Sequence, residues 1–100
     1  MLTGKQKSYL RSLANTMEPI IQVGKGGVTE TVASAVDQAL VAREIVKVSV
    51  LNNCLDPVDI VAQDLIKATD SQLVQQLGKK IVLYRHNPDN PVIQFPSGRD

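Results

Sequence analysis

The chain contains only one cysteine, one histidine and no tryptophan in 100 residues. A single cysteine cannot form a disulfide within the chain, and a zinc site of cysteine and histidine ligands is not expected. The sequence suggests no third residue that would complete a catalytic site with Cys54 as nucleophile and His86 as base. Cys54 is expected to be a small buried residue. We therefore expect no cofactor, no metal and no catalytic residue.

Long apolar runs and an excess of charge of one sign are also absent. No run approaches the roughly 20 residues that a membrane-spanning helix needs. The N-terminal segment 1–5 lacks the apolar core of a signal peptide. The net charge is only +1, so charge alone favours no class of partner. We expect a single cytoplasmic domain over 1–100, monomeric, with neither a membrane nor a small molecule as its partner.

The most distinctive stretch is a glycine-rich loop, Gly24-Lys25-Gly26-Gly27, which precedes a segment typical of a helix from Thr29 onward. Glycine can adopt a positive φ, and its lack of a side chain lets another molecule approach the backbone. The first N–H groups of the helix and the positive end of its dipole face this loop and suit a phosphate. Lys25 adds a mobile positive charge. The alternative is that these glycines only form a tight strand-to-helix turn.

The same loop looks like the start of a nucleotide-binding loop, but the similarity ends after Thr29. A P-loop requires a later Gly-Lys-Ser/Thr, whose lysine contacts the β- and γ-phosphates and whose hydroxyl holds magnesium. Glu30-Thr31-Val32 follow here instead. We therefore do not expect an enzyme that hydrolyses nucleotides.

Apolar periodicity and turn residues predict the order helix, strand, helix, strand, helix, strand, strand. Thr3 and Gln6 form a capping-box pattern, and Thr29 is a candidate N-cap. Asp56 before Pro57 predicts an N-cap and a first helical position. The helices are expected over 4–15, 29–42 and 57–69, and the strands over 20–23, 45–51, 72–77 and 81–84. Residues 92–95 could dock on the body as an edge strand.

The strand over 45–51 predicts how helices and sheet are layered. Val46, Val48 and Val50 alternate with Lys47 and Ser49, so one face is expected to be buried and the other wet. Helices on one side of a sheet produce that pattern. The expected fold is a small α/β domain of the two-layer α+β kind, without an internal repeat or linker. Acids such as Glu44 are interpreted as caps and solubilising charges.

Positive charges occur in three places that lie far apart in the sequence. Lys5, Lys7 and Arg11 belong to the first helix, Lys25 to the glycine loop, and Arg85 to the end of the last strand. A compact domain could bring all of them onto one edge. For the helical charges, a solvated helix face is the simpler alternative.

Other features suit the recognition of a folded RNA better than the binding of an extended strand. The only aromatic residues are Tyr9, Tyr84 and Phe95, so a stacking surface for a long single strand is not indicated. Contacts with the backbone and shape of a folded RNA need fewer aromatics. The hairpin turn 78–80 carries two positive charges, and His86 is either solvated or a contact with a nucleic acid.

Several separated motifs, in the same order, resemble the YhbY family of CRM-domain RNA-binding proteins. The resemblance covers about residues 2–86, which would form the domain core, and leaves 87–100 as a C-terminal extension. The matching motifs are Leu2-Thr3-Gly4-Lys5-Gln6-Lys7, Tyr9-Leu10-Arg11, Val23-Gly24-Lys25-Gly26-Gly27-Val28-Thr29, Ile45-Val46-Lys47-Val48, Leu73-Val74-Gln75 to Gly78, and Ile81-Val82-Leu83-Tyr84-Arg85.

The resemblance implies a four-stranded mixed sheet with three helices, similar to the C-terminal domain of a bacterial translation initiation factor. It also implies a non-enzymatic protein that binds RNA through a Gly-x-x-Gly loop like that of KH domains. Stand-alone members are bacterial proteins that associate with precursors of the large ribosomal subunit. The candidate RNA-binding residues are Gly24, Lys25, Gly26, Gly27, Lys5, Lys7, Arg11 and Arg85.

Two alternatives to ribosomal RNA binding are retained. Plant organelle relatives embed the domain in longer proteins for intron splicing. A protein-interaction adaptor on the ribosome could use the wet sheet face around Lys47 and Ser49. The departures from the family pattern, Arg43 for a common histidine and Gln76 for an apolar residue, do not touch the loop.

Overall fold

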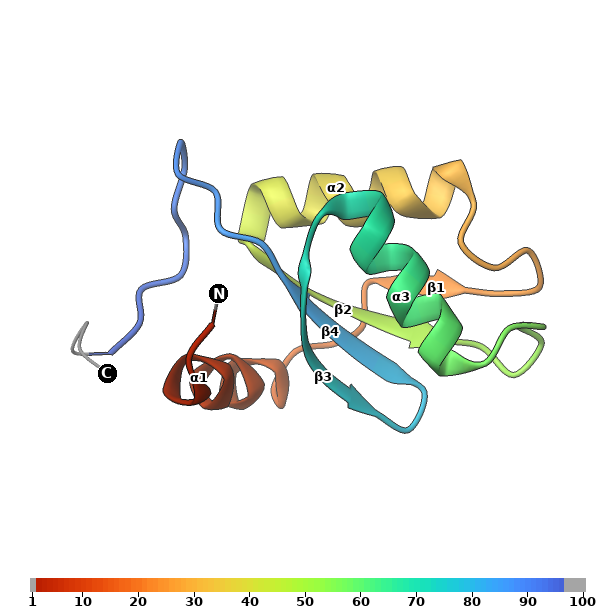
Figure 1. Ribbon diagram of the computed structural model, residues 1–100, viewed down its shortest axis with the longest axis horizontal. Coiled ribbons are helices and arrows are strands. Elements are labelled where there is room, and N and C mark those ends of the chain that lie inside the picture. The colour runs from red at the N-terminus through yellow and green to blue at the C-terminus, as the bar shows by residue number, and fades with distance from the viewer. Residues whose placement is uncertain (1, 97–100) are drawn as a thin grey trace.

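The computed structural model describes residues 2–96, which form three helices and four strands (Figure 1). The order of these elements confirms the predicted order, and every bound agrees within one residue. The elements are α1 (Gly4–Ala14), β1 (Ile21–Val23), α2 (Glu30–Arg43), β2 (Ile45–Val50), α3 (Val58–Thr69), β3 (Gln72–Leu77) and β4 (Lys80–Tyr84). Within residues 2–96, no helix is long and apolar enough to cross a membrane.

Side-chain caps explain where the first two helices begin. Thr3 Oγ1 accepts from the Gln6 N–H at 3.1 Å, and Gln6 Oε1 accepts from the Thr3 N–H at 2.9 Å, which completes the predicted capping box of α1. Thr29 Oγ1 accepts from the Val32 N–H at 3.2 Å and caps α2 as predicted.

The start of α3 differs from the prediction by one residue. Asp56 was the expected N-cap, but the N-cap is Pro57, which has extended backbone and makes no side-chain capping bond. The Asp56 carboxylate lies instead close to Gly27: a Cβ built on Gly27 would be only 3.0 Å from Asp56 Oδ2. A tertiary contact between two loops thus replaces the expected local cap.

The sheet has the strand order β1-β2-β4-β3, with β1 parallel to β2 and the other neighbours antiparallel. This arrangement confirms the α+β class and the four-stranded mixed sheet. Val23 is the register partner of Val50, and Ile45 that of Tyr84. The chain therefore leaves β1 at the end of the sheet where β2 also ends, and leaves β4 at the opposite end.

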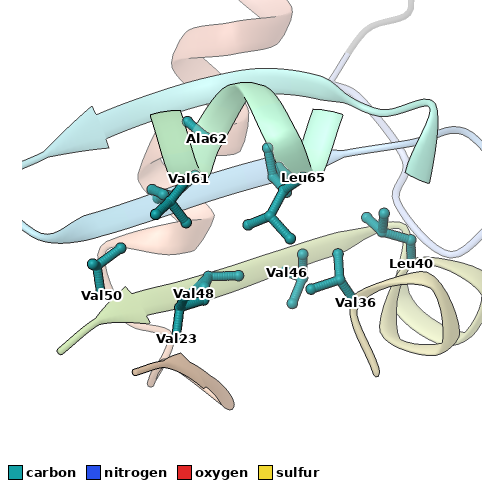
Figure 2. Close-up of a cluster of buried hydrophobic side chains, with 11 residues drawn as sticks. Val23, Val36, Leu40, Val46, Val48, Val50, Val61, Ala62 and Leu65 are labelled. Atoms are coloured by element: carbon teal, nitrogen blue, oxygen red, sulfur yellow. The ribbon is translucent and has the colours of Figure 1, made fainter. Parts of the chain in front are cut away.

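The larger core lies between the sheet and the helices α2 and α3 (Figure 2). The alternating valines Val46, Val48 and Val50 of β2 face this core, as their spacing predicts. Cys54 is half-buried against it. The other fully or largely buried members are Val23, Val36, Leu40, Val61, Ala62, Leu65, Ile81 and Leu83.

The other face of the sheet is covered, which corrects the expectation of a wet face. Helix α1 packs there through Leu10 and Ala14 in a second core, on the opposite side of the sheet from α2 and α3 (Figure 1). Ser49 is only 9% exposed. Lys47 Nζ donates to the carbonyl oxygens of Ala14 and Met17 at 3.0 and 3.3 Å. The lysine sits at the C-terminal end of α1 because the unpaired carbonyls there favour a cation.

Candidate nucleic-acid interface

The glycine loop is a tight turn with one conformationally special residue. The Gly27 N–H donates to the Gly24 carbonyl at 3.0 Å, and Gly27 has φ +68°. Positive φ is strained for residues with a Cβ, so this position requires glycine. Among the three loop glycines, only Gly27 uses this freedom.

The outer part of the loop is open to a ligand. Lys25 and Gly26 are exposed, and within residues 2–96 the Lys25 ammonium makes no hydrogen bond or ion pair. The backbone N–H groups of Lys25 and Gly26 also donate to no group in that range. Two free donors, a free cation and the N-terminus of α2 form an arrangement that binds anions such as phosphate. The carboxylates of Glu30 and Asp56 offset part of this charge, so the loop is an open contact and not a closed phosphate cage.

Three connections meet at the end of the sheet that carries this loop, and we call them the loop end: residues 24–29, 51–57 and 78–80 (Figure 1). The Leu51 N–H donates to the Val23 carbonyl at 2.8 Å, and this bond joins the starts of the connections 24–29 and 51–57. The Val50 N–H donates to the Lys79 carbonyl at 2.8 Å, and this bond joins the hairpin turn 78–80 to the end of β2.

The loop end includes two cations to which the sequence assigned no role. Lys79 and Lys80 are exposed, and Lys79 Nζ donates to Asn52 Oδ1 at 2.8 Å. The positive hairpin turn was visible in the sequence. Its position at the same end of the sheet as the glycine loop depends on the pairing of β4 with β2, which no local pattern reveals.

The cations of α1 do not join the loop end. Helix α1 lies across the second face of the sheet, where Lys5 is exposed and Lys7 is half-buried. Arg11 Nε donates to the Val74 carbonyl on the edge strand β3 at 3.3 Å. Lys7 and Arg11, one turn apart on α1, form a separate positive region away from the loop end, and Lys5 lies on another side of the helix.

Arg85 lies at the opposite end of the sheet from Lys25, so the expectation that all the positive groups share one edge is wrong. It follows β4, which runs antiparallel to β2 and ends beside Ile45. Arg85 Nη1 contacts Asp37 Oδ1 at 2.7 Å and the Thr69 carbonyl at 2.6 Å. Its guanidinium therefore joins α2 to the C-terminal end of α3.

Near Arg85, the fully buried carboxylate of Glu44 is hydrogen-bonded by the segment that follows β4. We call Glu44, Arg85 and residues 86–95 the closed end. Glu44 has φ 66° and ends α2. Its carboxylate accepts from the N–H groups of Asn87, Val92 and Ile93 at 2.7 to 2.8 Å. His86 Nδ1 lies 2.9 Å from Glu44 Oε2. The expected role of Glu44 as a solubilising charge is therefore wrong.

The electrostatics of this buried carboxylate follow from its partners. Burial alone would raise the pKa of Glu44, but the hydrogen bonds from Ile93, Asn87, Val92 and His86 outweigh burial and hold its pKa below the ordinary value. Burial and the negative charge of Glu44 raise the pKa of the neighbouring Tyr84 hydroxyl. Glu44 is therefore kept as an anion.

The C-terminal segment docks without forming the strand expected over 92–95. Ile93 and Phe95 pack against the second core. The Phe95 ring lies 5.7 Å from that of Tyr9 and 5.9 Å from that of Tyr84, between centroids. All three aromatic residues of the chain thus form one cluster, which serves packing. The remaining residues of the predicted extension, 97–100, lie outside the described residues.

The fold and the loop end define a small α+β domain with an exposed, lysine-bearing glycine loop where its first strand leads into a helix. The CRS1/YhbY (CRM) domain model matches residues 2–85, and the chain belongs to this family. It is 51% identical over 96 residues to "Probable RNA-binding protein YqeI" of Bacillus subtilis, covering 96% of this chain and 100% of the relative. It is 32% identical over 95 residues to an "RNA-binding protein" of Haemophilus influenzae, covering 95% of both.

A solved structure supports the fold. The solution structure of a hypothetical protein from Staphylococcus aureus, described as a suggested RNA-binding protein, matches with a TM-score of 0.78 and 49% identity. The match covers 96% of this chain and 100% of that protein. The family, the three helices and the mixed sheet of the sequence analysis are therefore confirmed.

Proposed function

We propose that this protein binds RNA without catalysing a reaction, and that the glycine loop is its primary contact. The observation that carries the proposal is the open loop, in which the Lys25 ammonium and two backbone N–H groups are free within residues 2–96. Such groups hold phosphates without reading bases. The names of the Bacillus and Haemophilus relatives support RNA as the polyanion.

We further propose that the RNA is ribosomal RNA in precursors of the large subunit. The support is the resemblance to stand-alone bacterial members of the family. The match to the Bacillus relative spans that protein's full length, so the relative is itself a bare domain of this kind. The adaptor alternative depended on the sheet face around Lys47 and Ser49, which α1 covers. No feature of the described residues favours the splicing alternative.

The other candidate residues take different places in this proposal. Lys7 and Arg11 form a second positive region, which a large RNA reaches around the β3 edge, and Lys5 adds a positive charge on another side of α1. Arg85 is engaged by Asp37 and Thr69, so its main contribution is to the fold. RNA contact at Arg85 would require the RNA to reach the far end of the sheet.

An NMR titration of the labelled protein with a structured fragment of large-subunit ribosomal RNA, at two salt concentrations, tests the proposal. We expect shifts centred on Gly24 to Gly27 that weaken at high salt, because phosphate contacts release counterions. Lys25→Glu should weaken binding by roughly tenfold or more, with the folded spectrum retained.

Lys67→Glu is the matched control, because Lys67 is an exposed lysine in the last turn of α3, at the other end of the molecule. Equal losses for Lys25→Glu and Lys67→Glu would show attraction by net charge alone. Unchanged affinity of Lys25→Glu would reject the loop as the contact. If no resonance of the protein shifted on adding the RNA at low salt, this RNA would be rejected as the ligand.

A further inference from the structure

Asn53 lies against the glycine loop with its amide group available. It is exposed, and a Cβ added at Gly24 would lie 3.4 Å from Asn53 Oδ1 and 3.9 Å from its Nδ2. Within residues 2–96, the Asn53 side chain makes no hydrogen bond. A free carboxamide beside a phosphate-binding loop presents both a donor and an acceptor to whatever the loop holds.

A second cation stands on the other side of this amide. Lys79 Nζ donates to Asn52 Oδ1 at 2.8 Å, so the neighbouring asparagine positions the lysine. Val23 pairs with Val50, and Ser49 pairs with Lys80, so β1 and β4 flank β2 at this end. Gly24 and Lys79 are thus about two strand spacings, or 10 Å, apart across the sheet. A few nucleotides of one strand span this distance.

Acidic residues border this line on one side. The carboxylates of Glu30, Asp56 and Asp59 lie on the side where α2 and α3 begin. Among the described residues, the two most exposed large apolar side chains, Leu55 (78%) and Leu77 (67%), both lie in or beside the loop end. Exposed apolar side chains beside basic groups offer a base a place to pack.

We propose that Lys25, Asn53 and Lys79 form one track for an unpaired loop of a structured RNA, in which the two lysines hold phosphates and Asn53 contacts a base edge. An amide meets the Watson–Crick edge of a base only when the base is unpaired. Phosphate contacts position the strand, and the amide contact supplies sequence preference. This proposal rests on the proposed RNA-binding function and adds a base-contacting residue to it.

Binding of hairpin RNAs with one stem and loops of equal length but varied sequence, compared with a blunt duplex of the same stem, tests the track. We expect the hairpins to bind more tightly than the duplex. Asn53→Ala should weaken the preferred loop by roughly five- to tenfold and flatten the preference among loops. Lys79→Gln should weaken all hairpins about equally and reduce the salt slope by about one.

The controls are Asn90→Ala and Lys67→Gln, exposed residues of the same types away from the loop end. Amide NMR spectra establish that each variant is folded. If Asn53→Ala and Lys79→Gln bind every RNA like the wild type while Lys25→Glu loses affinity, the track is wrong and RNA binding through the loop stands. If Lys25→Glu also binds normally, the loop proposal itself fails. Equal binding of hairpin and duplex would reject an unpaired ligand.

Discussion

The two ends of the sheet use charged residues in opposite ways. At the closed end, the Glu44 carboxylate is fully buried and satisfied by three backbone N–H groups and His86, and Arg85 is paired with Asp37. At the loop end, Lys25 and Lys80 are exposed and have no side-chain partner within residues 2–96.

This difference separates charges that hold the fold together from charges that are available to a partner. A buried and fully bonded carboxylate contributes to folding, because its loss leaves donors unsatisfied. An exposed lysine contributes little to folding stability, and its unpaired positive charge can attract a negatively charged ligand. Substitutions of charged residues at the closed end should therefore change stability, and substitutions of charged residues at the loop end should change affinity.

The largest expected effect on stability is that of Glu44→Gln. The amide NH₂ group would face backbone N–H donors, so the free energy of unfolding should fall by about 3 kcal/mol. Urea denaturation followed by circular dichroism measures this loss. Glu18→Gln removes the same charge at an exposed site and should change stability by less than about 0.5 kcal/mol. Equal midpoints for the two variants would show that the buried carboxylate does not hold the C-terminal segment.

The pH dependence of stability tests the same carboxylate without changing the fold at neutral pH. The pKa of Glu44 is lowered in the folded state, so the unfolded chain takes up its proton first as the pH falls. The stabilisation is complete above the ordinary carboxyl pKa of about 4.3 and is lost as the pH falls through the lower folded-state pKa. Denaturation series between neutral and acidic pH should show this loss in the wild type. Glu44→Gln should show a shallower dependence, and identical slopes would contradict the prediction.

A smaller effect is expected from Gly27→Ala in the loop end. Its φ of +68° costs about 1–2 kcal/mol for a residue with a Cβ, and that Cβ would lie 3.0 Å from Asp56 Oδ2. Gly26→Ala is the matched control, because Gly26 has no positive φ and its nearest contact is Thr29 Cγ2 at 3.4 Å. Thermal unfolding compares the two. If both variants melt alike, the turn does not depend on the left-handed residue.

The smallest expected effect is that of Arg85→Ala. The ion pair with Asp37 is partly exposed, so it is worth little by itself, and the bond to the Thr69 carbonyl adds to it. We expect a loss of about 1 kcal/mol in unfolding free energy and a smaller change in RNA affinity than Lys25→Glu causes. Fluorescence-detected RNA binding decides the second point. A loss of affinity as large as that of Lys25→Glu would move Arg85 into the RNA-binding surface.

Local patterns predicted the elements well because their causes are local. The Thr3–Gln6 capping box, the Thr29 cap and the alternation in β2 each depend on residues a few positions apart. The predicted cap at Asp56 was wrong, because α3 has no side-chain capping bond and the Asp56 carboxylate lies against Gly27, which is distant in the sequence. The wet face of β2 failed for a related reason, since Lys47 looks like a surface residue until α1 presents its C-terminal carbonyls.

The sequence by itself determined the seven elements, their order, the family and the glycine loop with its lysine. The tertiary structure alone decided which charges are neighbours, because strand order and direction place residues that are far apart in the chain. Antiparallel pairing of β4 with β2 brings Lys79 to the loop end and carries Arg85 to the closed end. Glu44 became an anchor only when the segment after β4 folded back and its backbone N–H groups met the carboxylate.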